Sequence, residues 1–300
     1  MSVADARPSP ARRARPSGVS SRRRLINGLF VAAVYAAVLV AAVPLALLVY
    51  FVVAKGASQI SWSFLTEALP ISARRKTGGI GPAIVGTLLV TALAAALAIP
   101  LGVLGAVYLN EYGKASRTAS ALRFLANVLA GVPSIVMGLF IYTIFVLRFS
   151  GGGRIAFAGS LALACLMLPI VIRSTEEMLR LVPNHLREAS MALGASQSRT
   201  VLTVVLPAAL PGITSGSMLA VARAAGETAP VLFTIGFATR VNWNPFSGPN
   251  TTLAQFIFGN AGQPYPAAVS RAWGAAFTLI VLVLLLTAAA RFVAARFTVR

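Results

Sequence analysis

An arginine and a glutamate stand four residues apart within an apolar stretch of this chain, in the run ARAAGETAP that covers residues 222–230. On a helix, positions i and i+4 share one face, so the Arg223 guanidinium and the Glu227 carboxylate can pair. An arginine at the centre of a membrane helix costs about 2.5 to 3.5 kcal/mol, which disfavours exposure to lipid. Two interpretations stay open: a buried ion pair that holds helices in register, and an anion site or gate in a water-filled pathway.

The residues around this pair are compatible with an anion. The planar fork of Arg223 can bind two oxygens of an oxyanion at once. Gly226 and the neighbouring alanines leave room for a backbone or a ligand. Pro230 cannot donate a hydrogen bond to the carbonyl of Gly226, so we expect the helix to be irregular one turn outward of Arg223.

A second stretch, residues 188–213, is far less apolar at its start than the blocks on either side. Its first half predicts a short helix that ends at Gly194, because glycine readily takes the left-handed conformation that closes a helix. Its second half is apolar and contains Pro207 and Pro211, where a helix must kink or restart. We therefore expect a helix, a glycine turn and a proline-punctuated helix, which together form a rigid elbow on a membrane surface.

The composition indicates an all-α integral membrane protein. Of the 300 residues, 57% are hydrophobic and only 11% are charged, and the mean hydropathy is +0.81. A soluble domain carries roughly a quarter charged residues. The net charge of +19 does not indicate nucleic-acid binding, because most basic residues lie in the first 24 positions or flank apolar blocks. Basic residues beside apolar spans indicate which side of the membrane each loop occupies. We therefore expect this chain to lie in a lipid bilayer.

Six apolar blocks predict six transmembrane helices. Their approximate ranges are 25–54, 84–108, 124–147, 155–173, 211–237 and 272–291. Residues 1–24 are rich in Arg, Pro and Ser and predict a disordered basic tail. With both termini in the cytoplasm, seventeen basic residues lie on that side and eight on the other, which favours this N-in, C-in orientation. The loop 174–210, which contains most of the elbow, is then cytoplasmic, and Glu176 and Glu177 are expected to be solvated there.

The elbow also carries a family resemblance. Its Glu188-Ala189, Leu193-Gly194-Ala195, Leu206-Pro207 and Pro211-Gly212-Ile213 resemble the cytoplasmic EAA loop of bacterial ABC-importer permeases. The run ARAAGETAP, the GGIGP run at residues 78–82 and the AWGAA run at residues 272–276 are similar to the PstA-type permease subunits of phosphate ABC importers. The resemblance covers residues 78–295 and implies a permease domain with the type I importer fold.

The resemblance implies a function and partners. Arg223 would compensate the charge of phosphate within the membrane, and Glu227 would orient or release Arg223. Glu188, Ala189, Gly194 and Ala195 would couple this chain to an ATPase. The implied partners are a second permease subunit of similar fold, two ATP-binding subunits and an extracytoplasmic phosphate-binding protein. The implied location is the bacterial plasma membrane, and no cofactor is expected.

Other functions stay open on the sequence. An importer for molybdate or sulfate is compatible with the Arg223–Glu227 pair, and so is a secondary anion transporter or channel. A membrane scaffold without transport gives no reason for charge within a span. The sequence has no GxxxxGK[ST] phosphate-binding loop, so we do not expect this chain to hydrolyse ATP. His185 is the only histidine and can supply a single ligand, so no metal site is expected.

Overall fold

The structure is a computed structural model that describes residues 21–75, 77–113 and 116–297, and the regular elements of these residues are all helical. The chain divides into two units, residues 1–50 and residues 51–300. Most of the predicted tail, residues 1–20, lies outside the described residues. Helix α1 (Ser21–Gly56) begins before the predicted start of the first span at residue 25. The arginines at residues 22–24 end the apolar block but belong to the helix, because arginine has a high helix propensity.

The second unit continues with helices α2 to α13, some of them interrupted by π-helical turns. The bounds are α2 Trp62–Thr66, α3 Gly81–Val107, α4 Arg117–Gly131, α5 Ser134–Ile141, α6 Leu147–Phe149, α7 Ala156–Leu181, α8 Asn184–Ala192, α9 Gln197–Thr200, α10 Leu206–Gly226, α11 Ala229–Thr234, α12 Leu253–Ala261 and α13 Pro266–Phe297. A 3-10 turn follows α1 at Ala57–Gln59, and the π-helical turns are Tyr108–Tyr112, Tyr142–Val146 and Val201–Val205.

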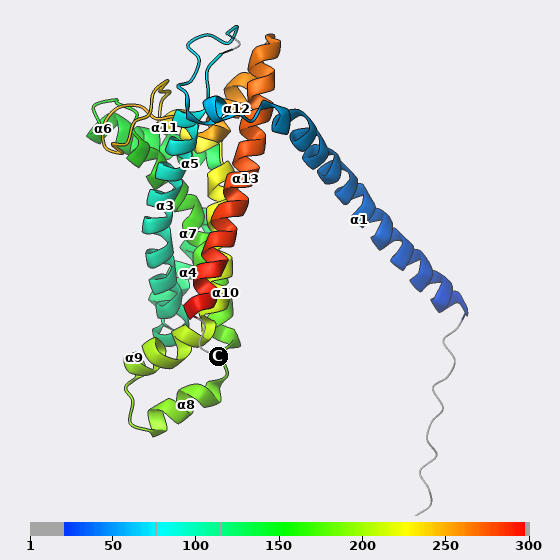
Figure 1. Ribbon diagram of the computed structural model, residues 1–300. Helices are drawn as coiled ribbons and strands as arrows, with labels where there is room; N and C mark the ends of the chain where they lie inside the picture. Colours follow the sequence, from blue (N-terminus) through cyan, green and yellow to red (C-terminus); the bar gives the residue numbers. More distant parts are fainter. Residues whose placement is uncertain (1–20, 76, 114–115, 298–300) are drawn as a thin grey trace, which may run out of the picture. The chain divides into compact units, whose positions relative to one another are not determined.

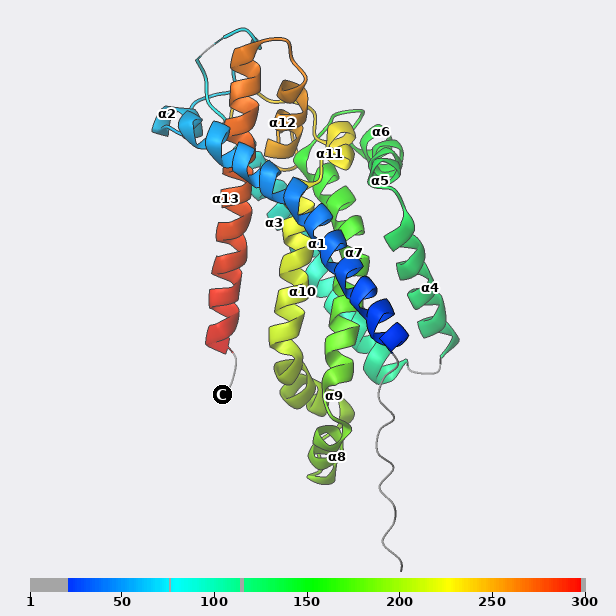
Figure 2. The same ribbon diagram turned by 90° about the vertical axis from the view of Figure 1, so that its right-hand side faces the viewer.

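Helices α3, α7 and α10 form the centre of this unit and lie side by side (Figures 1 and 2). Their shared core is rich in small residues, including Ala94 on α3 and Ala220 on α10, both fully buried. A Cβ atom at Gly102 would lie 2.6 Å from the Val171 side chain of α7, so only glycine permits this approach of the two helices. Small residues thus let the three backbones pack closely, as is common in membrane bundles.

The third predicted span, residues 124–147, is not one continuous helix. Helices α4 and α5 are bent by 105° at a break that contains Val132 and Pro133. Pro133 lacks an amide donor, and the residue before a proline is pushed towards extended backbone, as Val132 is here with ψ 126°. Among the described residues, five helices are long and apolar enough to cross a membrane, or six if this bent pair counts as one span.

Helices extend from both sides into the segment 174–210 that is predicted to be a cytoplasmic loop. Helix α7 continues to Leu181, and the helical run of α9, a π-helical turn and α10 extends from Gln197 to Gly226. Charged residues end an apolar block but not the backbone hydrogen bonds of a helix, so the helix ends do not coincide with the boundaries that hydropathy gives. Helix α10 begins at Leu206 with Pro207 in its first turn, directly after the π-helical turn at Val201–Val205. The hydrogen-bond pattern therefore changes just before this proline, while the helical run continues to Gly226.

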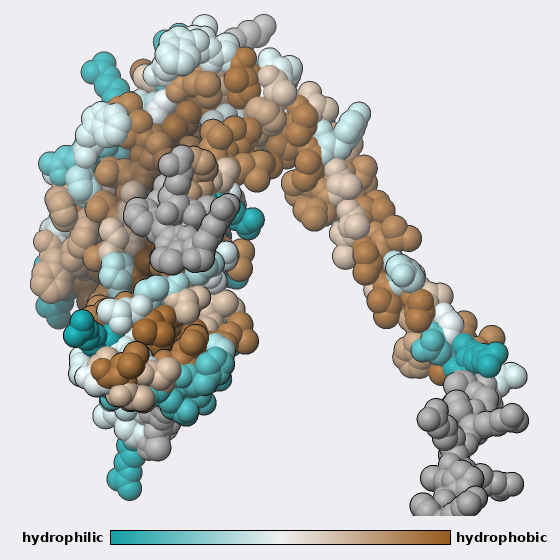
Figure 3. Space-filling view, turned by 60° about the horizontal axis from the view of Figure 1, so that its bottom comes forward, coloured by the Kyte–Doolittle hydropathy of each residue, from teal (hydrophilic) through white to brown (hydrophobic). Residues whose placement is uncertain are grey.

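The two ends of the second unit differ. Helices α8 and α9 and the last turns of α13 lie at one end, and α6, α11 and α12 lie at the other (Figures 1 and 2). In Figure 3, the end that carries α8 and α9 comes forward and shows hydrophilic and hydrophobic side chains side by side. The predicted elbow and the C-terminal helix therefore end on the same side, as the predicted orientation requires.

Candidate functional site

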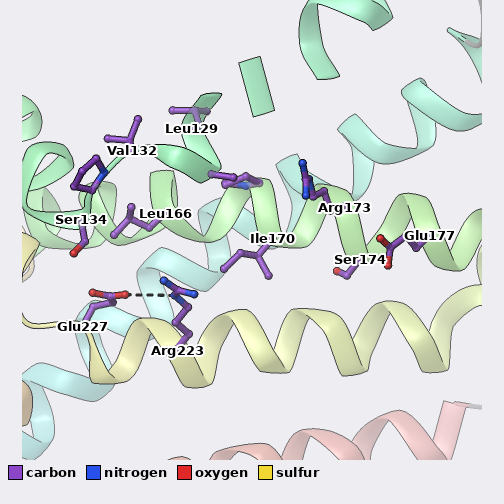
Figure 4. Close-up of a pocket in the computed structure, with 13 residues that line it drawn as sticks. Leu129, Val132, Ser134, Leu166, Ile170, Arg173, Ser174, Glu177, Arg223 and Glu227 are labelled. Atoms are coloured by element: carbon purple, nitrogen blue, oxygen red, sulfur yellow. Dashed lines mark ion pairs between the residues drawn. The ribbon is translucent and has the colours of Figure 1, made fainter. Parts of the chain in front are cut away.

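Arg223 and Glu227 lie in a groove that α4, α5, α7 and α10 form together (Figure 4). The groove has a volume of about 500 Å³. Its walls combine apolar side chains with four charged ones, and the lining residues are Leu129, Ala130, Val132, Pro133, Ser134, Leu166, Pro169, Ile170, Arg173, Ser174, Glu177, Arg223 and Glu227. The bend at Pro133 helps to open this space, because Val132, Pro133 and Ser134 all line it.

The backbone breaks at the position that Pro230 predicts. Helix α10 ends at Gly226, Glu227 is extended with ψ 130°, and α11 starts at Ala229 with the proline in its first turn. Arg223 Nε and Glu227 Oε1 are 3.5 Å apart, so the predicted i,i+4 pair is present. The pair therefore occupies the last turn of a helix and the irregular residue after it.

This pair is not buried within the chain. The Arg223 side chain is 70% exposed, whereas that of Glu227 is 19% exposed. Within the described part of the chain, the Arg223 guanidinium makes no hydrogen bond, and Figure 4 shows it pointing into the groove. A guanidinium has five N–H donors, so most of them remain available to a ligand.

A second arginine and glutamate, which the sequence analysis did not select, line the same groove. Arg173 and Glu177 are also four residues apart, on α7. Helices α7 and α10 run in opposite directions, so the two guanidinium groups lie between the two carboxylates along the groove (Figure 4). Arg173 donates a hydrogen bond to Asn127 Oδ1 at 2.6 Å, which connects it to α4. The shared Arg-x-x-x-Glu spacing is a sequence signal that could have identified this pair.

The predicted glycine turn of the elbow is confirmed. Helix α8 ends at Ala192, Leu193 caps it, and Gly194 has a φ of +87°. Ser196 then starts α9 by accepting a hydrogen bond from the Arg199 amide. A left-handed backbone at Gly194 is the conformation that L side chains rarely adopt, so the turn needs this glycine.

The predicted coupling residues lie on or beside the exposed face of α8. Glu188 and Ala189 are exposed, and Ala189, Gly194 and Ala195 line a shallow hollow of about 500 Å³. Leu193 is 90% exposed at the same hollow, and Leu186 is 37% exposed. A hollow that is rimmed by exposed leucines suits contact with another protein. Glu188 is outside the lining of this hollow.

The prediction that Glu176 is solvated is wrong, whereas Glu177 is exposed as predicted. Glu176 is only 8% exposed and pairs with two arginines, Arg123 at 3.0 Å and Arg180 at 2.6 Å. Arg123 reaches it from α4, so the partner is 53 residues away in sequence. Hydropathy alone does not reveal such a pair, because both residues belong to polar links between apolar blocks.

Comparison with known proteins agrees with this architecture. The family described as "Binding-protein-dependent transport system inner membrane component" matches residues 98–299. The phosphate transport system permease protein PstA 1 of Mycobacterium tuberculosis (strain CDC 1551 / Oshkosh) is 43% identical over 280 residues, which are 92% of this chain and 91% of that protein. The phosphate transport system permease protein PstA of Haemophilus influenzae is 38% identical over 88% of this chain and 92% of that protein.

Two solved structures share the fold at low sequence identity. A bacterial ABC transporter involved in the import of the acidic polysaccharide alginate aligns with a TM-score of 0.59 and 14% identity, over 93% of this chain and 97% of that chain. An inward-facing MetNI methionine ABC transporter aligns with a TM-score of 0.53 and 21% identity, over 73% and 93%.

The family of binding-protein-dependent permeases consists of multi-pass inner-membrane subunits that work with a separate ATPase and a binding protein. Its profile matches two thirds of this chain, and the relatives align over almost its whole length. The groove and the elbow both lie within the part of the chain that matches the family. This chain belongs to the family of inner-membrane components of binding-protein-dependent transport systems, together with the PstA-type permeases.

Proposed function

We propose that this chain is the membrane-spanning permease subunit of an ATP-driven importer that moves inorganic phosphate across the plasma membrane by alternating access. The relatives at 38% and 43% identity are phosphate transport permeases, which supports the substrate class. The observation that carries the proposal is the exposed Arg223 guanidinium, which faces a groove between membrane helices instead of being buried against protein.

The chemistry of the groove suits an oxyanion. Moving an anion into an apolar helix bundle is costly unless a charged donor replaces its hydration. Arg223 supplies a positive charge and paired N–H donors, and Arg173 places a second guanidinium in the same groove. Glu227 holds Arg223 at 3.5 Å when no anion is bound, and it competes with the anion for the guanidinium when the anion leaves. Glu227 is thus the orienting and releasing partner.

The proposed assembly contains a second permease subunit of similar fold, two ATP-binding subunits and an extracytoplasmic phosphate-binding protein. Closure of the ATP-binding subunits displaces the surface made by Glu188, Ala189, Gly194 and Ala195. Helix α8 follows α7 after Val182 and Pro183, and α9 continues through a π-helical turn into α10, so this displacement reaches both helices that carry groove arginines. The groove then opens alternately to the two sides of the membrane.

Phosphate uptake into membrane vesicles tests the whole proposal. Vesicles that contain the complete transporter are expected to accumulate labelled phosphate with ATP and the binding protein, and to fail when the ATP-binding subunit is omitted. An excess of sulfate or molybdate is expected to leave uptake unchanged. Inhibition by either anion would assign another oxyanion, and uptake without the ATPase would assign a secondary transporter.

The coupling role of the elbow has a separate test. A Cβ at Gly194 meets no atom within 4 Å, so Gly194→Val acts through its φ of +87° and not through a clash. We expect this variant to insert normally, while ATPase association and uptake fall. Gly262→Val is the matched control, because Gly262 is equally open but has a φ of −90°. Unchanged association and uptake in Gly194→Val would show that the elbow is not the coupling element.

A further inference from the structure

Helix α8 has few buried side chains that hold it to the rest of the protein. Arg187 is its only buried residue, although the helix runs from Asn184 to Ala192. Non-helical residues join it at both ends, Val182 and Pro183 before it and the left-handed Gly194 after it. A helix with two such joints and little apolar burial can rotate instead of transmitting a displacement, unless another contact holds it.

Arg187 makes that contact through a saturated hydrogen-bond network. Its Nη2 donates to Glu111 Oε1 at 2.8 Å, and its Nε donates to Glu111 Oε2 at 3.2 Å, which is a two-point arrangement. The same guanidinium donates to the carbonyls of Leu179 at 2.9 Å and Val182 at 2.6 Å. Arg187 and Glu111 are only 9% and 8% exposed. One side chain thus joins α8, the end of α7 and a residue 76 positions away.

Glu111 holds the other side of the turn as well. Its backbone carbonyl accepts a hydrogen bond from Gln197 Nε2 at 2.7 Å, and Gln197 is the first residue of α9. Glu111 belongs to the π-helical turn that continues α3 into the polar link. The two helices on either side of Gly194 are therefore both attached to the same residue at the end of α3.

We propose that Arg187, Glu111 and Gln197 form a latch that makes α8 and α9 move as one body with the ends of α3 and α7. The inference rests on the proposed role of the elbow as the coupling element. All three are positioning residues. When an ATP-binding subunit displaces α8, the latch prevents rotation at Pro183 and Gly194, so the displacement reaches the bundle. Without the latch, the same displacement turns α8 on its joints and leaves the groove unchanged.

The test uses the assembled transporter and a variant with no charge imbalance. Glu111→Gln/Arg187→Gln removes the ion pair and leaves neither partner charged. Arg117→Gln is the matched control, because Arg117 is an exposed basic residue at the start of α4, six positions from Glu111. Co-purification with the ATP-binding subunit first shows that the transporter has assembled. The first readout is the amount of ATP hydrolysed per phosphate imported into membrane vesicles. The second readout is the distance between spin labels at Met191→Cys and Tyr112→Cys. Both labelled positions are exposed, and Cys165→Ala removes the native cysteine.

We expect the double variant to assemble and hydrolyse ATP, to need several-fold more ATP per phosphate, and to show a broadened distance distribution. Arg187→Lys keeps the charge but loses the planar fork, so its effect should be intermediate. A double variant with the normal ratio and a narrow distribution would overturn the latch. If the double variant does not assemble, Arg187→Lys is used in its place: a normal ATP-to-phosphate ratio with a narrow distance distribution in that variant would overturn the latch.

Failure of the latch can be told apart from failure of the proposed function. If Gly194→Val uncouples the transporter and the double variant does not, the elbow couples without the latch. If neither changes the ratio, the elbow itself is not the coupling element. The spin-label distance does not depend on which anion is carried, so an error in the substrate class leaves that readout intact.

Discussion

The Arg187–Glu111 pair beside α8 and the Arg223–Glu227 pair in the groove use the same two residue types in opposite surroundings. The first pair joins residues 76 positions apart, is buried, and has its guanidinium donors bound to carbonyls and a carboxylate. The second pair is local, has a 3.5 Å separation between Arg223 Nε and Glu227 Oε1, and leaves the Arg223 side chain 70% exposed. A saturated guanidinium holds structure together, whereas an unsaturated one in a groove is free to bind an anion.

This difference bears on the structural and functional interpretations that the sequence left open for Arg223. A structural pair gains stability only when burial and hydrogen bonding satisfy both charges. An exposed i,i+4 pair contributes about 0.3 to 0.5 kcal/mol, which is too little to explain an arginine within a membrane span. The geometry therefore favours a role for Arg223 that needs its free donors.

The largest expected effect is the loss of uptake in Arg223→Gln. Phosphate uptake should fall to background while the amount of protein in the membrane stays near normal, because the exposed pair adds little stability. Arg223→Gln/Glu227→Gln should also be inactive, since neutrality does not restore a two-point donor. Uptake assays with immunoblots measure both quantities. Recovery of uptake in the double variant would make Arg223–Glu227 a structural pair like Arg187–Glu111.

A large effect on stability is expected at the other pair. Arg187→Gln takes the guanidinium away from a buried carboxylate, and breaking a buried pair costs about 3 to 5 kcal/mol. The purified variant should unfold at lower temperature or denaturant, and adding Glu111→Gln should restore part of the loss. Arg117→Gln should change the unfolding free energy by no more than about 0.5 kcal/mol. Equal stability of Arg187→Gln and this control would remove the contrast between the two pairs.

A smaller effect is expected for Arg223→Lys, which keeps the positive charge in the groove. Lysine offers a point charge without the planar fork, so uptake should be poor but measurable. Glu227→Gln should be milder still, because it removes only the orienting partner. Initial rates over a range of phosphate concentrations distinguish weaker binding from slower release. Wild-type kinetics in Arg223→Lys would show that charge alone, and not geometry, serves the anion.

The smallest expected effect is that of single cysteine substitutions, whose labelling shows on which side of the membrane each end of the bundle lies. In a Cys165→Ala background, Ser198→Cys on α9 should be labelled only from the cytoplasmic side. Ser247→Cys, in the loop before α12, should be labelled by an impermeant reagent from outside. Both residues are exposed, so accessibility reports topology. Labelling of both from one side would mean that a span is misplaced. Labelling of Ser198→Cys from outside would mean that the latch does not face the ATPase.

The sequence predicted most reliably the features that depend on a few consecutive residues. Gly194 indicated a left-handed turn, and Pro230 indicated an irregular helix one turn outward of Arg223; both are present. These predictions succeed because a dihedral angle or a missing amide donor acts within about one helical turn. A missing amide donor does not by itself determine how far a helix bends. The chain bends by 105° at the break that contains Pro133, whereas the helical run Gln197–Gly226 passes Pro207 without a break.

The sequence by itself determined the membrane-spanning helical class, the elbow with its glycine turn, and an arginine that needs a reason to lie within a span. Only the tertiary structure decided that Arg173 shares the groove with Arg223 and that Glu111 is the partner of Arg187. The physical reason is that both results depend on how α3, α7 and α10 pack along their lengths. Close packing of small residues brings side chains together from positions 50 or more residues apart, and no local pattern encodes this proximity.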